Sequence, residues 1–592
     1  MKADTVFAPA QRVDFGEALL PPEGYRLEAA LGTTFSMDFL TALTVPVSLA
    51  LRGGVQREEL LASPLAALAA MRRLEDRVTV CVEAGNIHPP AGKRTALVSL
   101  LEGLVREVSP PKGASFHPKL WLLRFAPEDG GPMRQRLIMM SRNLTRDRSW
   151  DVALRLEGEE KAEHQRANAP LVGLIDWLPV EKNSHLRGLR DGLQHVRWER
   201  VPGFSPPLFH AHHPLAQARD LWRPGRGQLA VISPFCDDAG LGALGRDRIQ
   251  ALVACDDWLA ALKSPLPRSL MLADHGLPEP DPEAAFSAED RAGLHAKLYV
   301  LEQGEDTVIT LGSGNATSAG LGLNGPRNIE VFASLRGRTT NIGGIGLDGA
   351  GILGVGGIGP LLQDWMPRAP REDEIAAKIF NDAVRAARHA IIAAGAKLSF
   401  APLEDRLSLN LSLVLPDLPD IAEIRAQLVT RDNGVLLQGA GPWDLGSVRL
   451  ADATSFVQFD LCGLDGERAG FVTNLEAEGL PEGDARLKAL LSDIVRTPEQ
   501  FLSFVAAMLE QRPDIEGMIR AASEGGGSAR GTRPVPPVLE TMLAAYLDDD
   551  GPARLRDLDR VVGLMGRDLG GEVMREFLNL WGEFKTALGK AA

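Results

Sequence analysis

The sequence has few of the features that mark secreted, metal-binding or membrane proteins. Only four cysteines occur in 592 residues, and Cys81, Cys236, Cys255 and Cys462 are scattered without metal-ligand spacing. We therefore expect a reduced, cytoplasmic setting and no structural zinc. The first residues, MKADTVFAPAQRVDFGE, hold no apolar core of the signal-peptide kind. No uninterrupted apolar run is long enough to span a membrane, so no membrane association is predicted.

An excess of positive charge is also missing. Lysine and arginine number 64 against 78 aspartates and glutamates, which gives a net charge of −14. This balance argues against indiscriminate binding of nucleic acid, which needs local positive charge. Arginines do gather in two places, the first with Arg134, Arg136, Arg142, Arg146 and Arg148 and the second with Arg187, Arg190, Arg197 and Arg200. The first cluster could hold phosphates of a polymer, whereas the second fits a solvated, salt-bridged surface at least as well.

Two segments repeat one order of polar residues. FHPKLWLLRF is followed by SRNLTRDRSWDVALRL, and LHAKLYVL is followed by GSGNATSAGLGLNGPRNIEVFASL. Each copy has a His-x-Lys pair at the head of an apolar run, then Ser-x-Asn, then an acid between apolar residues. The candidate catalytic residues are His117, Lys119, Asn143 and Asp151 in the first copy, and His295, Lys297, Asn315 and Glu330 in the second. The repetition predicts a two-fold active site.

These residue types suit phosphodiester chemistry. A phosphodiester repels anionic nucleophiles, so a neutral imidazole is a good attacker, and a second imidazole can protonate the departing oxygen. Lysine and asparagine supply positive charge and amide donors for the non-bridging oxygens, so we expect no metal and no other cofactor. An acid can fix the tautomer of a histidine by accepting its other N–H. Candidate substrate ligands in and next to the Ser-x-Asn segments are Ser141, Thr145, Ser313, Thr317, Arg142 and Arg146.

The repeated segments resemble the signature of the phospholipase D superfamily, a duplicated His-x-Lys-(x)4-Asp followed by Gly-Ser-x-Asn and a later acid. The second copy matches closely and includes the glycine, Gly312. In the first copy Met140 replaces that glycine and Asp151 replaces the later glutamate. The motif aspartate is absent from both copies, because Arg124 and Glu302 stand in its place. The resemblance covers roughly residues 20 to 370.

The resemblance implies an α/β fold of two phospholipase D-like halves, each with a mixed β-sheet flanked by helices. We predict the first half over residues 1–195 and the second over residues 196–370. A helix and a β-rich accessory module follow over 371–480, and a helical C-terminal region with a linker at 523–537 completes the chain at 481–592. The final helices are amphipathic, and docking within the chain is the default expectation. The glycine-rich stretch 343–359 is interpreted as a flexible loop and not as a dinucleotide fingerprint, since no clear strand precedes it.

The resemblance also implies a function. We predict a metal-independent phosphodiesterase that forms a phosphohistidine, with His117 as the nucleophile and His295 as the acid. With its long extra domains, the chain is similar in layout to superfamily members that look like DNA nucleases of bacterial restriction or phage-defence systems. This resemblance implies DNA as a binding partner. A helicase or another defence protein is a further candidate partner, and the chain could form a homodimer. A lipid phosphodiesterase or phosphatidyltransferase is one alternative. A non-catalytic nucleic-acid-binding subunit of a defence complex is another.

Overall fold

The computed structural model describes residues 7, 13–50, 64–74, 76–90, 94–146, 149–180, 184–273, 293–323, 327–347, 349, 351–481, 483–509, 538–547, 551–565 and 568–591. The predicted linker at 523–537 lies outside these residues. Within the described ranges, no helix is both long enough and apolar enough to cross a membrane.

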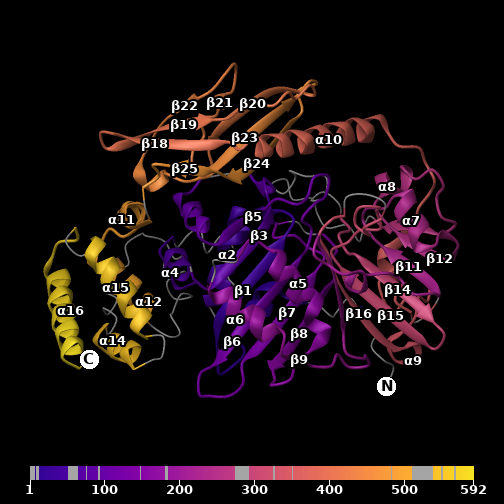
Figure 1. Ribbon diagram of the computed structural model, residues 1–592, viewed down its shortest axis with the longest axis horizontal. Coiled ribbons are helices and arrows are strands. Elements are labelled where there is room, and N and C mark those ends of the chain that lie inside the picture. The colour runs from indigo at the N-terminus through magenta and orange to yellow at the C-terminus, as the bar shows by residue number, and fades with distance from the viewer. Residues whose placement is uncertain are drawn as a thin grey trace.

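Two mixed sheets form the body of the molecule (Figure 1). The first has the order β5-β3-β1-β6-β7-β8-β9, and the second has the order β10-β16-β15-β14-β11-β12-β13-β17. The strands of the first sheet are β1 (Tyr25–Thr34), β3 (Val78–Glu83), β5 (Val105–Val108), β6 (Leu120–Pro127), β7 (Arg134–Met140), β8 (Ala153–Glu160) and β9 (Val196–Trp198). Those of the second are β10 (Leu208–His212), β11 (Gln228–Ile232), β12 (Ile249–Val253), β13 (Ser269–Leu272), β14 (Leu298–Gln303), β15 (Asp306–Gly312), β16 (Glu330–Arg338) and β17 (Leu362–Asp364).

One strand order occurs in both sheets. The series β5-β3-β1-β6-β7-β8 in the first sheet corresponds to β13-β12-β11-β14-β15-β16 in the second. In each series three strands run parallel to one another, and the next three continue as an antiparallel set. The predicted fold class, two similar α/β halves with mixed sheets, is confirmed.

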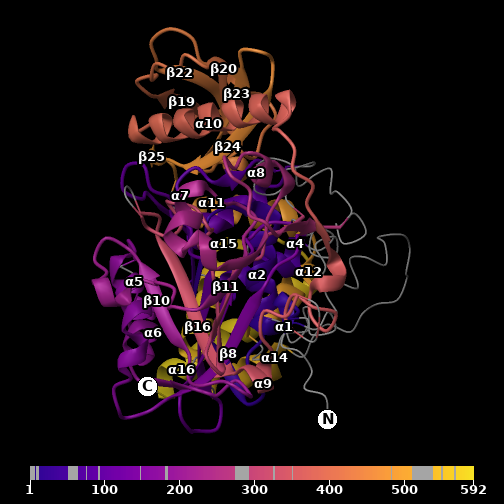
Figure 2. The same ribbon diagram turned by 90° about the vertical axis from the view of Figure 1, so that its right-hand side faces the viewer.

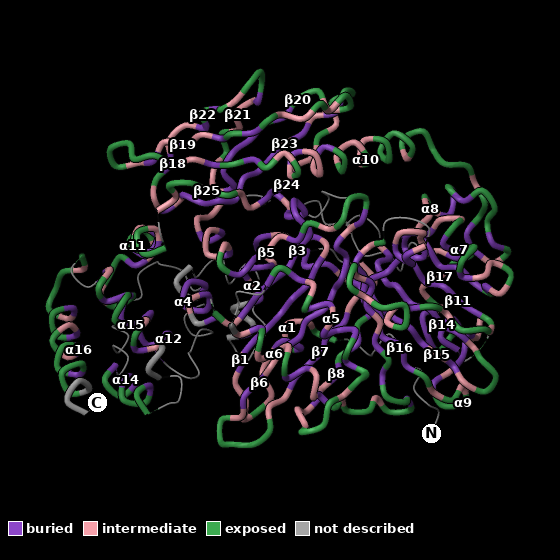
Figure 3. Tube along the Cα trace, in the orientation of Figure 1, coloured by how far each residue is buried: buried purple, intermediate pink, exposed green. Residues whose placement is uncertain are grey.

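The sheets are buried on both faces, as expected for parallel strands covered by helices. Alternate residues of β6 enter different cores: Trp121 and Leu123 lie in one, whereas Leu120 and Leu122 lie in the core that the two halves share. Figure 3 shows that the strands of both sheets are largely buried. The covering helices are α1 (Phe15–Leu19), α2 (Phe39–Ala50), α4 (Pro64–Leu74), α5 (Ala169–Trp177) and α6 (Ser184–Leu193) for the first half, and α7 (Asp238–Leu244) and α8 (Asp256–Ala260) for the second.

The accessory module follows the second half and begins with the long helix α10 (Glu372–Ala393). A four-stranded sheet has the order β22-β19-β18-β25, and a second sheet has the order β2-β4-β24-β23-β20-β21. Their strands are β18 (Lys397–Leu403), β19 (Arg406–Ser412), β20 (Ile421–Leu428), β21 (Val435–Leu436), β22 (Trp443–Val448), β23 (Phe456–Gly463), β24 (Arg468–Asn474), β25 (Glu476–Glu478), β2 (Met37–Asp38) and β4 (Ile87–His88). Figure 2 shows α10 beside these sheets.

The accessory module is joined to the first half by a shared sheet. Strands β2 and β4 belong to the first half in sequence, yet β4 pairs with β24 through Ile87 and Val472. Phe456 of β23 packs edge-on against Phe39 of α2, with ring centroids 5.1 Å apart. Glu102 accepts hydrogen bonds from the backbone N–H of Ser455 at 2.9 Å and from Arg486 at 2.7 Å. The module therefore extends the core of the first half.

The C-terminal helices also pack on the first half. They are α11 (Gly483–Ile494), α12 (Pro498–Leu509), α14 (Val538–Tyr546), α15 (Gly551–Met565) and α16 (Glu572–Ala591). Phe501, Phe504 and Trp581 belong to the same buried cluster as Trp121 of β6. Docking within the chain, the default expectation for these amphipathic helices, is what the structure shows.

The glycine-rich segment 343–359 follows α9 (Thr339–Ile342) and is a folded loop in its described part. Ile352 and Ile358 are buried in the core shared by the halves. A backbone hydrogen bond joins the N–H of Ile352 to the carbonyl of Gly344 at 2.9 Å, and Glu302 accepts the N–H of Ile345 at 2.6 Å. The segment is thus a loop, as predicted, and its described residues are packed and anchored.

Candidate active site

The polar residues of the two sequence repeats occupy equivalent positions in the two sheets. His117 and His295 precede β6 and β14, and the Ser-x-Asn segments follow β7 and β15. Asp151 precedes β8, and Glu330 opens β16. Because these antiparallel strands alternate in direction, all of these chain positions fall at the same edge of each sheet. The fold thus gathers each set as the repeat predicts.

Backbone hydrogen bonds join the two edges. The N–H of His117 donates to the carbonyl of Ile329 at 3.0 Å, and the N–H of His295 donates to the carbonyl of Trp150 at 2.8 Å. Phe116 bridges to Ile329 and Trp150 bridges to Leu294, both in parallel fashion. The residues before each histidine therefore pair with the residues before the acid of the other half, which brings both motifs to one seam.

Each histidine faces the acid of the opposite half. The Nδ1 atom of His117 lies 3.0 Å from Oε2 of Glu330 and is hydrogen-bonded to it. The Nδ1 atom of His295 lies 3.5 Å from Oδ1 of Asp151, an ion-pair distance without a hydrogen bond. An acceptor at Nδ1 leaves Nε2 as the atom that can attack phosphorus or exchange a proton.

Glu330 is wholly buried, and its charge is compensated locally. Burial alone raises the pKa of a carboxyl group, but the charge and hydrogen bond of His117, the charge of Lys119 and the Ser313 hydroxyl outweigh it. The pKa of Glu330 therefore lies below its ordinary value. The side chain stays ionised at neutral pH and can orient His117.

The two serines hold the acids. Ser141 donates a hydrogen bond from Oγ to Oδ1 of Asp151 at 3.0 Å and accepts the N–H of Val152 at 3.0 Å. Ser313 likewise donates to Oε2 of Glu330 and accepts the N–H of Val331 at 3.0 Å. Both serines were predicted as substrate ligands, and in this structure their hydroxyls are committed to the acids.

The two lysines place positive charge inside the site. Lys119 donates from Nζ to the carbonyl of His117 at 3.3 Å, and Lys297 donates to the carbonyl of His295 at 2.9 Å. Their ammonium groups lie 5.5 Å and 5.9 Å from the ring centroids of Phe35 and Phe235. Both lysines are buried. Two buried cations at one seam form an environment that favours an anion.

Asn143 and His295 carry unused hydrogen-bonding capacity. Neither atom of the Asn143 amide, and neither ring nitrogen of His295, is hydrogen-bonded to a residue that the structure describes. Asn315 accepts a weak hydrogen bond from the Ser233 hydroxyl at 3.4 Å. Leaving a buried polar group unsatisfied costs about 1–3 kcal/mol, so such groups call for an explanation. A phosphate bound between the motifs would accept from these donors.

The remaining predicted ligands have local partners. The carbonyl of Thr145 accepts from Arg142 at 2.9 Å, and the Thr317 hydroxyl accepts the N–H of Gly320 at 3.1 Å. Arg146 follows Thr145 in the chain and is half-buried. Arg136 is buried and donates to Glu157 and to the carbonyls of Ala18 and Leu20, so it supports the fold and does not face a polymer. In the second arginine cluster Arg190 pairs with Asp176, which agrees with a salt-bridged surface.

The residues that replace the two motif aspartates stabilise the fold. Arg124 pairs with Glu160 at 2.7 Å and with Glu28 at 2.8 Å. Glu302 anchors the glycine-rich segment through Ile345. Neither side chain contacts a motif histidine through these bonds, so the two substitutions leave the histidines and their acids intact.

Three polar residues of the site carried no motif signal. Asn328 accepts the N–H of Ser115 at 3.0 Å and donates to Oε1 of Glu330 at 3.2 Å, so it links the halves beside the first pair. Thr34 ends β1 and Ser233 directly follows the equivalent strand β11, and their hydroxyls accept the N–H groups of Leu144 and Ala316 at 2.9 Å. An alignment of the two halves would have revealed Thr34 and Ser233 as a matched pair.

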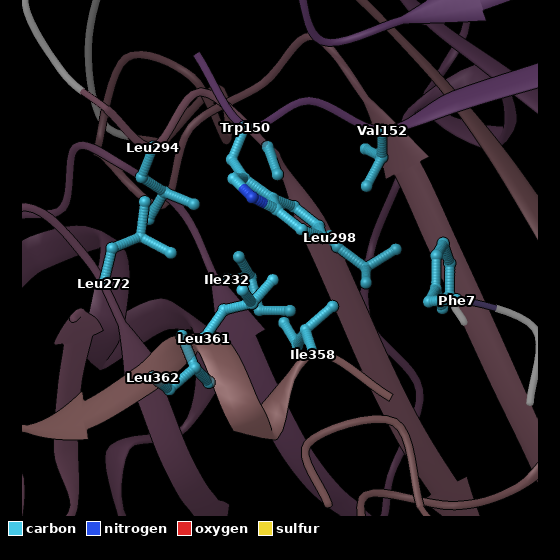
Figure 4. A pocket seen from close by; sticks show the side chains of 11 residues that line it. Phe7, Trp150, Val152, Ile232, Leu272, Leu294, Leu298, Ile358, Leu361 and Leu362 are labelled. Carbon is cyan, nitrogen blue, oxygen red and sulfur yellow. The ribbon is translucent and has the colours of Figure 1, made fainter. Parts of the chain in front are cut away.

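The histidines are enclosed in this structure. His117 is 3% exposed and His295 is 0% exposed. A diester can therefore reach both rings only when part of the surrounding structure moves. An apolar pocket lies behind the second motif, lined by Trp150, Ile232, Leu294, Leu298 and Ile358 among others (Figure 4). Its lining offers no charge to a phosphate, so the phosphate site is assigned to the polar side of the seam.

Comparison with known proteins gives only distant similarity. No protein-family model matches the chain, and no curated protein matches it. Yeast tyrosyl-DNA phosphodiesterase is similar over 55% of this chain and 86% of its own, with 10% identity and a TM-score of 0.34. Polyphosphate kinase from Porphyromonas gingivalis is similar over 54% of this chain and 41% of its own, with 16% identity and a TM-score of 0.28. Because both TM-scores lie below 0.5, neither similarity carries a functional argument.

Proposed function

We propose that this chain is a phosphodiesterase of the phospholipase D superfamily. The observation that carries the proposal is the crossed arrangement, in which Glu330 of the second half faces His117 and Asp151 of the first half faces His295. Two imidazoles that each face a carboxylate at one seam, beside two buried lysines, form the set that nucleophilic and acid–base catalysis on a diester requires.

The reaction proceeds in two displacements. Nε2 of one histidine forms a bond to phosphorus while the bond from phosphorus to the leaving oxygen breaks, and the other histidine gives its proton to that oxygen. A water molecule then attacks phosphorus, gives its proton to the second histidine, and the phosphorus–nitrogen bond breaks. The second histidine thus acts first as an acid and then as a base.

The geometry favours His117 as the nucleophile. Its Nδ1 is hydrogen-bonded to a carboxylate that stays ionised, so the neutral ring carries its proton on Nδ1 and leaves Nε2 free to attack. His295 is 3.5 Å from its acid without a hydrogen bond, so its ring is held less firmly. Mapping of the phosphohistidine tests the assignment. An adduct that persists in His117→Ala and is lost in His295→Ala would reverse it.

The lysines and asparagines compensate the charge of the phosphate. Lys119 and Lys297 supply positive charge, and the Asn143 amide supplies unengaged donors. Within the described residues, no cluster of three or more His, Cys, Asp or Glu could hold a metal ion. Activity that survives EDTA is the outcome we expect, and strict dependence on an added divalent metal would contradict this mechanism.

We further propose DNA as the substrate and a bacterial defence or DNA-processing system as the setting. Arg142 lies within the first Ser-x-Asn segment and Arg146 follows it, and both can contact phosphates that flank the cleaved one. A helicase or other defence protein is the partner that this proposal implies. Hydrolysis of a lipid diester and binding without catalysis are the competing functions.

Two assays test the proposal. Hydrolysis of bis(p-nitrophenyl) phosphate in EDTA is expected for the intact protein and lost in His117→Ala and in His295→Ala. His164→Ala is the matched control because His164 is exposed and lies outside the motifs. Incubation with single-stranded DNA, duplex DNA, RNA and phosphatidylcholine vesicles then identifies the substrate. Cleavage of lipid alone would support the lipid enzyme, and full activity in both motif variants would refute the catalytic site.

A further inference from the structure

The accessory module reaches the first histidine motif through one buried carboxylate. Glu83 ends β3, is 1% exposed, and accepts the backbone N–H of Phe116 at Oε2 over 2.6 Å. Phe116 directly precedes His117. The bond therefore fixes the chain at the point from which the candidate nucleophile projects.

The other oxygen of Glu83 faces α10 of the accessory module. Oε1 accepts from Asn86 at 3.1 Å and from Arg388 at 3.2 Å, and Nε2 of His389 lies 3.8 Å away. Arg388 also donates to the amide oxygen of Asn86. Figure 1 shows α10 beside β24 and above β3 and β5. One carboxylate thus connects α10 to the backbone of the first motif.

The contact with α10 is closely packed. Gly85 has φ +71°, and a Cβ atom at this position would lie 2.6 Å from Cδ1 of Ile392 and 2.9 Å from Cγ of Arg388. Next to it, Glu107 accepts the N–H of Gly85 at 2.8 Å and the N–H of Asn474 at 2.9 Å. The turn after β3 is therefore held on two sides by the accessory module.

The second half has no such carboxylate. Ser233 is the counterpart of Thr34. In the strand register next to these two residues, Cys255 after β12 occupies the position that Glu83 of β3 occupies in the first half. Cys255 lies with Sγ 3.9 Å from the carbonyl of Leu294, the residue before His295. The link through a charged side chain is thus specific to the first motif.

We propose that Glu83 is a positioning residue for His117, and that Arg388 makes this positioning depend on the accessory module. The proposal rests on the proposed function. With Arg388 in contact, the guanidinium compensates the negative charge of Glu83, and the carboxylate can accept the Phe116 N–H. Without Arg388, the buried charge loses its arginine partner and the carboxylate turns toward solvent, which releases the backbone before His117.

Kinetics with matched arginine variants test the proposal. Arg388→Ala is expected to lower kcat on bis(p-nitrophenyl) phosphate by about 10- to 100-fold, the scale of a misplaced reacting group, while KM stays within about twofold. Arg385→Ala is the control, because Arg385 lies on the same helix and pairs with Asp382 at the surface. Equal kcat values for the two variants, or a change confined to KM, would overturn the proposal.

Variants of Glu83 separate positioning from simple loss of structure. Glu83→Gln keeps an acceptor for the Phe116 N–H and removes the charge that Arg388 neutralises. In the Arg388→Ala background, Glu83→Gln is therefore expected to restore part of kcat, because no uncompensated charge remains. A further loss of kcat in the double variant would contradict the proposed coupling.

Amide hydrogen exchange gives a readout that does not depend on activity. The peptide that contains Phe116 and His117 is expected to exchange faster in Arg388→Ala than in Arg385→Ala, whereas the peptide around His295 is unchanged. If the histidine variants show that the chain is not a phosphodiesterase, this difference still tests the positioning. Identical exchange in both arginine variants would refute it even in an active enzyme.

Discussion

The carboxylate of Glu330 lies 3.0 Å from Nδ1 of His117 across 213 positions of sequence. The pair joins the two halves, so the first histidine has no oriented ring without the second half. The same holds in reverse for His295 and Asp151, at a longer distance. Each half therefore supplies a histidine that faces an acid of the other half.

Replacement of Glu330 by glutamine is expected to lower kcat by about 10²- to 10⁴-fold, because the amide can stabilise the wrong tautomer of His117, as in other histidine–acid pairs. Asp151→Asn is expected to cost less, since His295 makes no hydrogen bond to Asp151. Steady-state rates on bis(p-nitrophenyl) phosphate measure both. A larger loss of kcat in Asp151→Asn would show that catalysis depends more on the Asp151–His295 pair than on the Glu330–His117 pair.

Stability is expected to fall in acid through Glu330. Its folded-state pKa is lower than its ordinary value, so its contribution to stability is present above the unfolded pKa of about 4.3 and is lost as the pH falls through the folded pKa. Thermal unfolding between about pH 5 and pH 3 should therefore be less pH-dependent in Glu330→Gln than in the parent. An unchanged pH dependence would argue against an ionised Glu330.

A mixture of the His117→Ala and His295→Ala proteins is expected to remain inactive. Both histidines and both acids of the site lie within one chain, so each variant carries a broken site. The assay is hydrolysis of the generic diester after the two proteins are mixed at equal concentration. Recovered activity would indicate a site assembled between two copies by exchange of halves.

The buried thiols are expected to resist alkylation. Burial raises the pKa of Cys81 to about 12, and burial together with Asp237 raises the pKa of Cys236 to about 12. Iodoacetamide at about pH 8 reacts with thiolate, so mass spectrometry should find modification of the half-exposed Cys462 before either buried cysteine. Rapid labelling of Cys81 in the native protein would contradict the packing around β3.

Phe456→Ala is expected to destabilise the first half together with the accessory module. Phe456 is buried, belongs to the first-half core and packs on Phe39, so its removal should cost about 3–5 kcal/mol. Chemical denaturation followed by tryptophan fluorescence measures the loss. Two separated transitions, with only the module weakened, would show that the shared sheet does not couple the two parts.

The sequence predicted the two halves and their motifs because His-x-Lys, Ser-x-Asn and the acids recur in one order. It did not predict that each acid serves the opposite histidine, since the crossing arises from the Phe116–Ile329 and Trp150–Leu294 backbone bridges. Glu83 was not predicted as a site residue, because this glutamate at the end of an apolar strand has no counterpart in the second repeat. The joining of β4 to β24 rests on a single long-range pairing that a two-residue strand cannot signal.

The crossed pairs also limit how far the two halves can diverge. Asp151 is one methylene shorter than Glu330, and its carboxylate lies farther from its histidine, at 3.5 Å against 3.0 Å. A substitution of Asp151 or Glu330 removes the carboxylate that faces a histidine on the other side of the seam. The helices and loops of the two halves can therefore differ in sequence, but the histidine of one half and the acid of the other must change together.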